Sequence, residues 1–175
     1  MKKSAIERDL IALGIDPTDY RVLKLLPLVY VAWADGNMEA VERERIMNLA
    51  RSQFPIGESG MRLLKMWLYV APSRRYIQQG LRDLLALARA PDGLDINVEE
   101  LPMLLAYAES IARSTALGLD APWSVTPAEE AALSEIAALL RIDNGTSWAS
   151  LLRELDTARL PEPHVDASGS WSWGV

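Results

Sequence analysis

The sequence predicts an all-α protein: a compact bundle of about seven to eight helices built from repeated helix-turn-helix corners, with an extended C-terminal tail. Apolar residues recur three and four positions apart through most of the chain, and Pro, Asp, Ser or Thr stand where helices would begin. No segment has the alternation or the β-branched density of a strand. With 175 residues, half of them apolar, the chain is long enough to bury its own core. We therefore expect a helical domain over residues 1–160 and an extended or disordered Trp-containing tail over residues 161–175.

Helix boundaries are well marked in the first half of the chain. Ser4-Ala5-Ile6-Glu7 is typical of a capping box, and Gly14 suits the left-handed stop of the helix that it opens. Asp16-Pro17 begins a second helix, which runs to about Ala34 with a kink or break just before Pro27, because proline lacks an amide hydrogen. The next three helices are expected to open at Glu39 or Asn37, at Ser59 and at Ser73.

Three more helices are predicted in the second half. The first follows a cap at Asn97 and extends to about Gly118. Thr126-Pro127-Ala128-Glu129 then opens a helix, because Thr can cap, Pro fits the first helical position and Glu can return to the cap backbone. That helix should stop at Asp143-Asn144-Gly145, before an eighth that opens at Thr146 or Ser147. The predicted core includes Trp33, Ile46, Leu49, Leu104, Leu133 and Ile136.

Composition excludes several classes of function. The formal net charge of -6 argues against a nucleic-acid partner, because such binding depends on Lys and Arg neutralising phosphates. Without Cys there is no disulfide or thiolate chemistry, which fits a reducing cytoplasm. The longest apolar run, Leu25–Ala34, is about half of what a bilayer requires, so it is expected to be a core helix. No secretory signal follows Met1-Lys2-Lys3, and we expect a cytoplasmic protein.

One spacing recurs at three corners of the chain. It consists of an apolar residue, Glu four positions later, an apolar residue after four more, and then an apolar residue and Ala three and four beyond that. The copies are Met38, Glu42, Ile46, Leu49 and Ala50; Ile96, Glu100, Leu104, Tyr107 and Ala108; and Val125, Glu129, Leu133, Ile136 and Ala137. Repeated spacing suggests a unit used more than once. A capping box on any amphipathic helix produces the same spacing, and the sequence leaves both explanations open.

The first corner carries a more specific pattern. An apolar run ends in Ala34, Asp35-Gly36 makes the turn, and Met38 and Glu42 follow. This pattern resembles the tellurite-resistance TerB family, small all-helical bacterial proteins in which two such corners pair in a compact bundle.

The resemblance extends in part to the third corner. Val125 and Glu129 match there, whereas an apparent insertion containing Asp120 replaces the Asp-Gly pair. The resemblance implies a non-enzymatic binding or scaffold module of bacterial tellurite-resistance, stress or phage-defence systems. It also implies other proteins as partners, including partners at the inner membrane surface, where the chain would be peripheral.

Acidic side chains at these corners raise the question of a metal ion, since Ca²⁺ and Mg²⁺ prefer oxygen ligands. A loop that starts at Asp35 does not fit an EF-hand, because Ala40 stands at the glycine position and Ile46 at that of the bidentate Glu. A site would need oxygens pooled from two corners. Each acid could instead serve backbone N–H groups at its own helix start, and both interpretations stay open. The candidate ligands are Asp35, Glu42, Asp120 and Glu129.

Catalysis has little support in the sequence. The single histidine, His164, lies in the predicted tail, away from any folded pocket. No common nucleophile, nucleotide-binding or metalloprotease motif is present. We therefore predict that the chain is not an enzyme, and the alternative is a small metal-dependent or carboxylate enzyme that uses the acidic corners.

The tail ends in Ser170-Trp171-Ser172-Trp173-Gly174-Val175. If this segment is extended, alternation places both indoles on one face, as in a short peptide that adds to a sheet edge or fills a groove. Trp171, Trp173 and Val175 are therefore candidate partner-binding residues. The groove could belong to a partner, to a second copy in a homo-oligomer or to the bundle itself, and the chain could be an adaptor that presents this tail.

Overall fold

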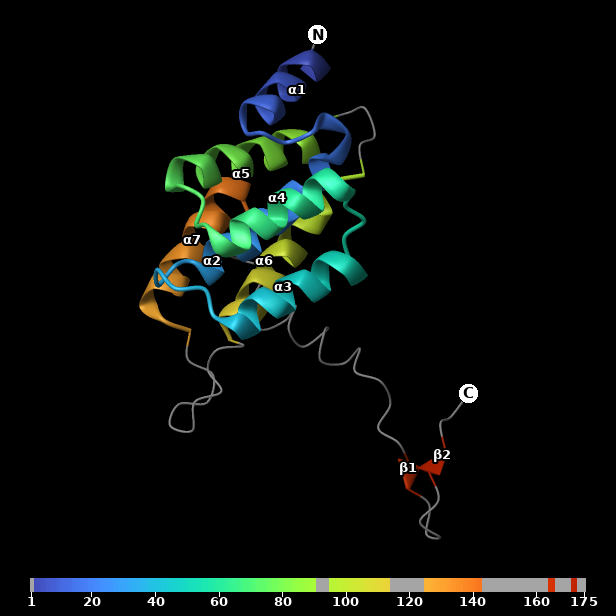
Figure 1. Cartoon of the computed structure of the whole chain (residues 1–175), viewed down its shortest axis with the longest axis vertical. Helices are drawn as coiled ribbons and strands as arrows, with labels where there is room; N and C mark the ends of the chain where they lie inside the picture. Colours follow the sequence, from blue (N-terminus) through green and yellow to red (C-terminus); the bar gives the residue numbers. More distant parts are fainter. Residues whose placement is uncertain (1, 91–94, 114–124, 143–163, 166–170, 173–175) are drawn as a thin grey trace. The chain divides into compact units, whose positions relative to one another are not determined.

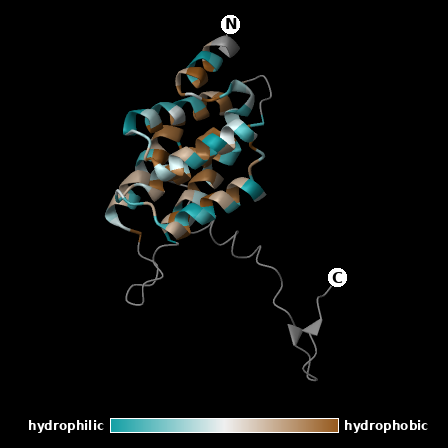
Figure 2. Cartoon of the chain, in the orientation of Figure 1, coloured by the Kyte–Doolittle hydropathy of each residue, from teal (hydrophilic) through white to brown (hydrophobic). Residues whose placement is uncertain are grey.

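Helix α2 (Leu26–Ala32) lies at the centre of the helical body and contacts most of the other elements (Figure 1). Apart from Tyr30, its side chains are buried, which its sequence LPLVYVA dictates. Around it lie the 3₁₀ segment η1 and the helices α3, α5, α6 and α7. Figure 2 shows apolar colour concentrated within this body and polar colour on its outer helices. The remaining bounds are α1 (Lys2–Ala12), η1 (Pro17–Leu25), α3 (Ala40–Ser52), α4 (Glu58–Tyr69), α5 (Arg74–Ala88), η2 (Val98–Glu100), α6 (Leu101–Ala112) and α7 (Pro127–Leu140).

The chain divides into two units, Met1–Asp143 and Asn144–Val175. This computed structural model describes residues 2–90, 95–113, 125–142, 164–165 and 171–172. Within those ranges it contains seven α-helices, which confirms the all-α bundle. The predicted eighth helix, with its Thr146 or Ser147 cap, lies outside the described residues.

Two of the predicted backbone breaks are confirmed. Gly14 has a φ of +72°, and the Ile15 N–H donates to the Leu10 carbonyl at 2.9 Å, which closes α1 with a left-handed glycine cap. Before Pro27, the 3₁₀ segment η1 ends at Leu25 and the α-helix α2 begins at Leu26. Proline there occupies the first turn of a new helix, where its missing N–H has no intrahelical acceptor.

Helix α4 starts differently from the prediction. The helix begins at Glu58, and Ser59 is not its cap. Its free N–H groups are bound instead by Asp19 of η1, whose carboxylate accepts from Gly57 N at 2.7 Å and from Gly60 N at 2.6 Å. Ser59 contributes its hydroxyl, which donates to the same carboxylate at 2.8 Å. A residue distant in sequence therefore caps this helix.

Two helix ends in the second half also differ from the prediction. Asn97 makes no side-chain cap hydrogen bond, and the single turn η2 precedes α6. Helix α7 ends at Leu140, short of Asp143, because Arg141 adopts a φ of +53° and the Ile142 N–H returns to the Ala137 carbonyl at 3.0 Å. This is the hydrogen-bond pattern of a glycine cap, formed here by an arginine.

The core follows the predicted periodicity, with some residues at its edge. Ile46, Leu104 and Ile136 are buried, as predicted. Leu49 and Leu133 are partly exposed, because the most buried rows of α3 and α7 pass through Ile46 and Ile136 and leave these two beside them. Trp33 is also partly exposed: it is the C-terminal cap of α2, and its indole N–H donates to the Trp67 carbonyl at 2.8 Å.

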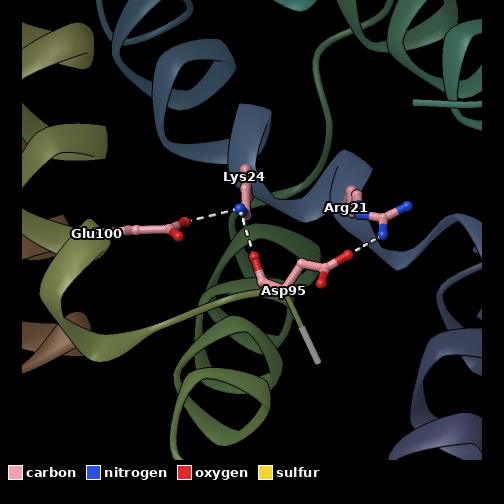
Figure 3. A network of polar contacts seen from close by, with 4 residues as sticks. All are labelled: Arg21, Lys24, Asp95 and Glu100. Atoms are coloured by element: carbon pink, nitrogen blue, oxygen red, sulfur yellow. Dashed lines mark hydrogen bonds and ion pairs between the residues drawn. The ribbon is translucent and has the colours of Figure 1, made fainter. Parts of the chain in front are cut away.

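A polar network fastens the segment before η2 to η1 (Figure 3). The Lys24 ammonium donates to the Asp95 carbonyl at 2.9 Å and to Glu100 Oε2 at 2.7 Å. Arg21 pairs with the Asp95 side chain in the same place. Lys24 is almost fully buried, and these acceptors replace the water that it loses.

In the second unit, β1 (His164–Val165) pairs antiparallel with β2 (Trp171–Ser172). Extended backbone was predicted for this tail, but strand pairing was not, and two residues per strand are too few for alternation to reveal it. In the described part of the chain, no helix is both long and apolar enough to cross a bilayer.

Candidate functional site

The first corner forms a tight turn between α2 and α3. Gly36 has a φ of +88°, a conformation that side chains disfavour, and its N–H donates to the Trp33 carbonyl at 2.9 Å. The exposed Asp35 accepts from the Asn37 N–H at 2.9 Å, and Met38 is buried beneath the turn. The Asp-Gly pair and the apolar residue therefore have the structural roles that their spacing suggests.

Glu42 follows this turn in the first turn of α3. The N-cap is Glu39, one of the two predicted caps, and its N–H donates to Glu42 Oε2 at 2.8 Å. The Glu42 side chain is only 2 % exposed. A carboxylate at this position is also stabilised by the positive end of the helix dipole.

The described part of the third corner, the start of α7, has a capping box like the start of α3. Thr126 caps α7: its hydroxyl accepts from the Glu129 N–H at 3.3 Å, and its own N–H donates to Glu129 Oε2 at 2.7 Å. This is the predicted capping box, with Pro127 at the first helical position. Glu129 is 3 % exposed.

The two corners act on one another electrostatically. The pKa of Glu42 is raised to about 7, mainly by burial and also by the charges of Glu129, Asp35 and Glu39, against the opposing hydrogen bond from the Glu39 N–H. Glu42 and Glu129 belong to helices far apart in sequence, so the fold brings the first and third corners into electrostatic range. We call Glu42 and Glu129 the corner pair. Asp120, the fourth candidate ligand, lies outside the described residues.

At the middle corner the acidic side chain has a different kind of partner. Ile96 is buried like Met38, but Glu100 is half-buried and its carboxylate binds Lys24, whereas Glu42 and Glu129 bind the backbone of their own caps. All three copies bury the final alanine, Ala50, Ala108 or Ala137. The three copies therefore share the burial of their final alanine, while Leu49, Tyr107 and Leu133 are partly exposed and the acidic position differs at the middle corner.

The corner pair offers carboxylate oxygens but an incomplete coordination shell. In both residues Oε2 accepts a backbone N–H, and no hydrogen bond reaches Oε1 within the described residues. No group of three or more His, Cys, Asp or Glu side chains arranged to hold a metal ion occurs in that part of the chain. The described residues thus provide two buried ligands at most, with the exposed Asp35 in electrostatic range.

Other polar clusters were not anticipated. Glu135 of α7 accepts from Tyr30 at 2.5 Å, from Gln78 at 2.7 Å and from Arg74 at 2.9 Å, which joins α7 to α2 and α5. Burial acts to raise the Glu135 pKa, but these hydrogen bonds outweigh it and the pKa is lowered. Nothing in the local sequence marks this residue, because its partners come from two other helices.

The predicted partner-binding tail lies mostly outside the described residues. Trp171 is in β2, where the backbone is extended, and His164 is in β1. Trp173 and Val175 are not described.

Comparison with protein families, with curated proteins and with solved structures finds no match to this chain. The TerB resemblance therefore stays a prediction from the residues of the corners.

Proposed function

We propose that the chain is a non-enzymatic TerB-like binding module of a bacterial tellurite-resistance, stress or phage-defence system. Its corner pair would respond to a divalent cation, Ca²⁺ or Mg²⁺, and its partners would be other proteins, including partners at the inner membrane surface. The observation that carries the proposal is the effect of the Glu129 charge on Glu42, since both are buried carboxylates in the first turn of their helices. Nucleic acid is not among the proposed partners, given the charge of -6.

The cation is favoured by an electrostatic imbalance. Like charges that are buried near one another disfavour joint ionisation, and a bound cation relieves that repulsion. Hard oxygen ligands suit Ca²⁺ or Mg²⁺, and both ions accept water for the positions that the protein does not fill. Asp35 would add a third oxygen ligand from the surface of the first corner, and Asp120 remains the proposed fourth.

The rival function is a carboxylate enzyme with Glu42 as general acid or base. A pKa of about 7 suits that role. However, the side chain is 2 % exposed and already accepts a backbone N–H, so a substrate could not reach its carboxylate without opening the corner. We therefore favour binding over catalysis.

The tail would supply a second contact. Trp171, Trp173 and Val175 remain the proposed residues for docking a partner or forming a homo-oligomer. Deleting residues 168–175 should leave the melting temperature nearly unchanged and abolish a pull-down interaction or a dimer. A monomer that loses many degrees on deletion would show that the tail is part of the fold.

The cation is tested by the melting temperature of the full chain in the presence of Ca²⁺ or Mg²⁺. A cation that binds only the folded state, at 100 times its dissociation constant, adds about 2.7 kcal/mol of stability. For a chain of this length, each kcal/mol of added stability raises the melting temperature by about 2–4 °C.

Two variants make the test specific. Asp35→Asn should abolish the response, and Glu130→Gln, which removes the same charge from an exposed neighbour of Glu129, should preserve it. A wild type indifferent to both cations, with Asp35→Asn losing stability in their absence, would identify Asp35 as a turn residue only.

A further inference from the structure

Helix α1 packs against α5 and η1. Leu10 is its buried anchor, and the Tyr76 hydroxyl of α5 donates to the Leu13 carbonyl just beyond the helix at 2.8 Å. Tyr76 is positioned in turn by an edge-on contact with Trp67, with ring centroids 5.9 Å apart. Ile11, on the same helix, is exposed. An unfavourable group on α5 near α1 would weaken this packing.

Such a group lies on α5. Asp83 is 6 % exposed, and its Oδ1 accepts from Gln79 Nε2 at 2.9 Å. Its Oδ2 is fully buried and has no hydrogen-bond partner in the described structure. An ionised carboxylate with an unpaired buried oxygen is destabilising, because it has lost water and gained nothing in return.

The charges around Asp83 do not offset the cost of its ionised carboxylate. Burial raises the pKa of Asp83 most, Asp9 of α1 raises it further, and Gln79 and Arg82 of α5 only partly oppose them. The like charge on α1 means that docking this helix opposes ionisation of Asp83.

Several ionisable groups of the neighbouring elements have partners elsewhere or are exposed. In η1, Asp19 binds the start of α4, while Arg21 and Lys24 bind the segment before η2. Arg8 of α1 has an interaction of its own. In α2 and α7, Tyr30 binds Glu135 and Glu129 binds the Thr126 N–H, and Glu130 is exposed.

We propose that Asp83 makes the docking of α1 onto α5 proton-controlled, so that α1 binds firmly when Asp83 is protonated and loosens when Asp83 ionises. The cause is the orphaned Oδ2 together with Asp9 across the contact. Protonation removes both the buried charge and the repulsion between the two helices. Helix α1 then separates from α5 more readily as the pH rises.

The direction follows from linkage. The docked state holds its proton to higher pH than the undocked state, so docking is strongest below the pKa of an exposed aspartate and weakens as the pH rises through the raised value. The opening equilibrium of α1 should rise about tenfold for each pKa unit by which docking raises Asp83.

Native-state hydrogen exchange of the full chain measures that opening at each amide. We would follow the amides of α1 from pH 4.5 to pH 8, corrected for intrinsic exchange, with amides of α7 as an internal reference. Opening of α1 should increase with pH relative to α7. In Asp83→Asn the increase should disappear, and in Asp9→Asn it should shrink.

Glu44→Gln is the matched control, because it removes one negative charge from an exposed position on α3. It should leave the pH dependence of α1 as in the wild type. A wild type without a pH-dependent opening of α1, or an Asp83→Asn protein that keeps it, would overturn the proposal. Since Asp9 is exposed, Asp9→Asn tests the same contact even if Asp83→Asn fails to fold: an unchanged pH dependence in Asp9→Asn would count against the repulsion between α1 and α5.

Discussion

Asp19 is the residue on which the start of α4 depends. Its carboxylate accepts from two backbone N–H groups and one hydroxyl, all from the segment Gly57–Gly60. Burial acts to raise its pKa, but these donors outweigh it and the pKa lies below the ordinary value. Because the folded pKa is depressed, the stability that Asp19 provides is present above about pH 4 and lost as the pH falls further.

Asp19→Ala should therefore destabilise the protein by about 3 kcal/mol at neutral pH, since it orphans several donors at once. Asp16→Ala removes an exposed cap, bound only to Thr18, and should cost about 1 kcal/mol. Urea unfolding at pH 7 and at pH 3 measures both. Equal losses for the two variants would mean that Asp19 is an ordinary cap.

Gly60 tests the same contact from the other side. A Cβ at this position would lie 2.8 Å from Asp19 Oδ2, so Gly60→Ala should destabilise the wild type even though alanine favours helices. In an Asp19→Ala background the clash is gone, and the same substitution should be neutral or stabilising by up to about 1 kcal/mol. A loss of the same size in both backgrounds would point to a cause other than Asp19.

At the scale of elements, residues that can cap a helix were easier to identify from the sequence than the hydrogen bonds that they make. Thr126 caps α7 with its side chain, whereas Asn97, the same kind of residue before α6, makes no side-chain cap bond. Thr126→Ala should cost about 1 kcal/mol, and Asn97→Ala only a few tenths, by urea unfolding. A larger loss at Asn97 than at Thr126 would reverse our assignment of the two helix starts.

The two helices also show why only part of the structure was predictable. Thr126 has its partner, Glu129, three residues away, so the local sequence contains the whole capping box. Glu100 shares the spacing of Glu129, yet it binds Lys24, which lies on a distant segment. Helix α7 is terminated by Arg141, whose backbone is left-handed, and the sequence does not indicate this because the residue is not a glycine. Periodicity and local capping residues predict where helices lie. The partners of acidic side chains and the residues at which helices end depend on tertiary contacts, which the local sequence does not show.

For the whole molecule, the corner pair is the feature that the sequence indicated and the fold assembled. The spacing predicted that Glu42 and Glu129 have equivalent places in two corners, but it could not show that the charge of one acts on the other. The raised pKa of Glu42 also gives a sign: the contribution of this residue to stability declines as the pH rises from about 4.5 towards 7. The same repulsion is what a cation would relieve.

The pH titration of the Glu42 side-chain carboxyl by NMR tests this contact most directly, in the full chain and in Glu129→Gln. Glutamine keeps an oxygen for the Thr126 N–H while it removes the charge, and Glu130→Gln removes the same charge from an exposed neighbour. We predict a midpoint of about 7 for Glu42 in the wild type and in Glu130→Gln, and a clearly lower midpoint in Glu129→Gln. A wild-type midpoint near the ordinary value of 4.5, or one unchanged in Glu129→Gln, would contradict the pairing of the two corners.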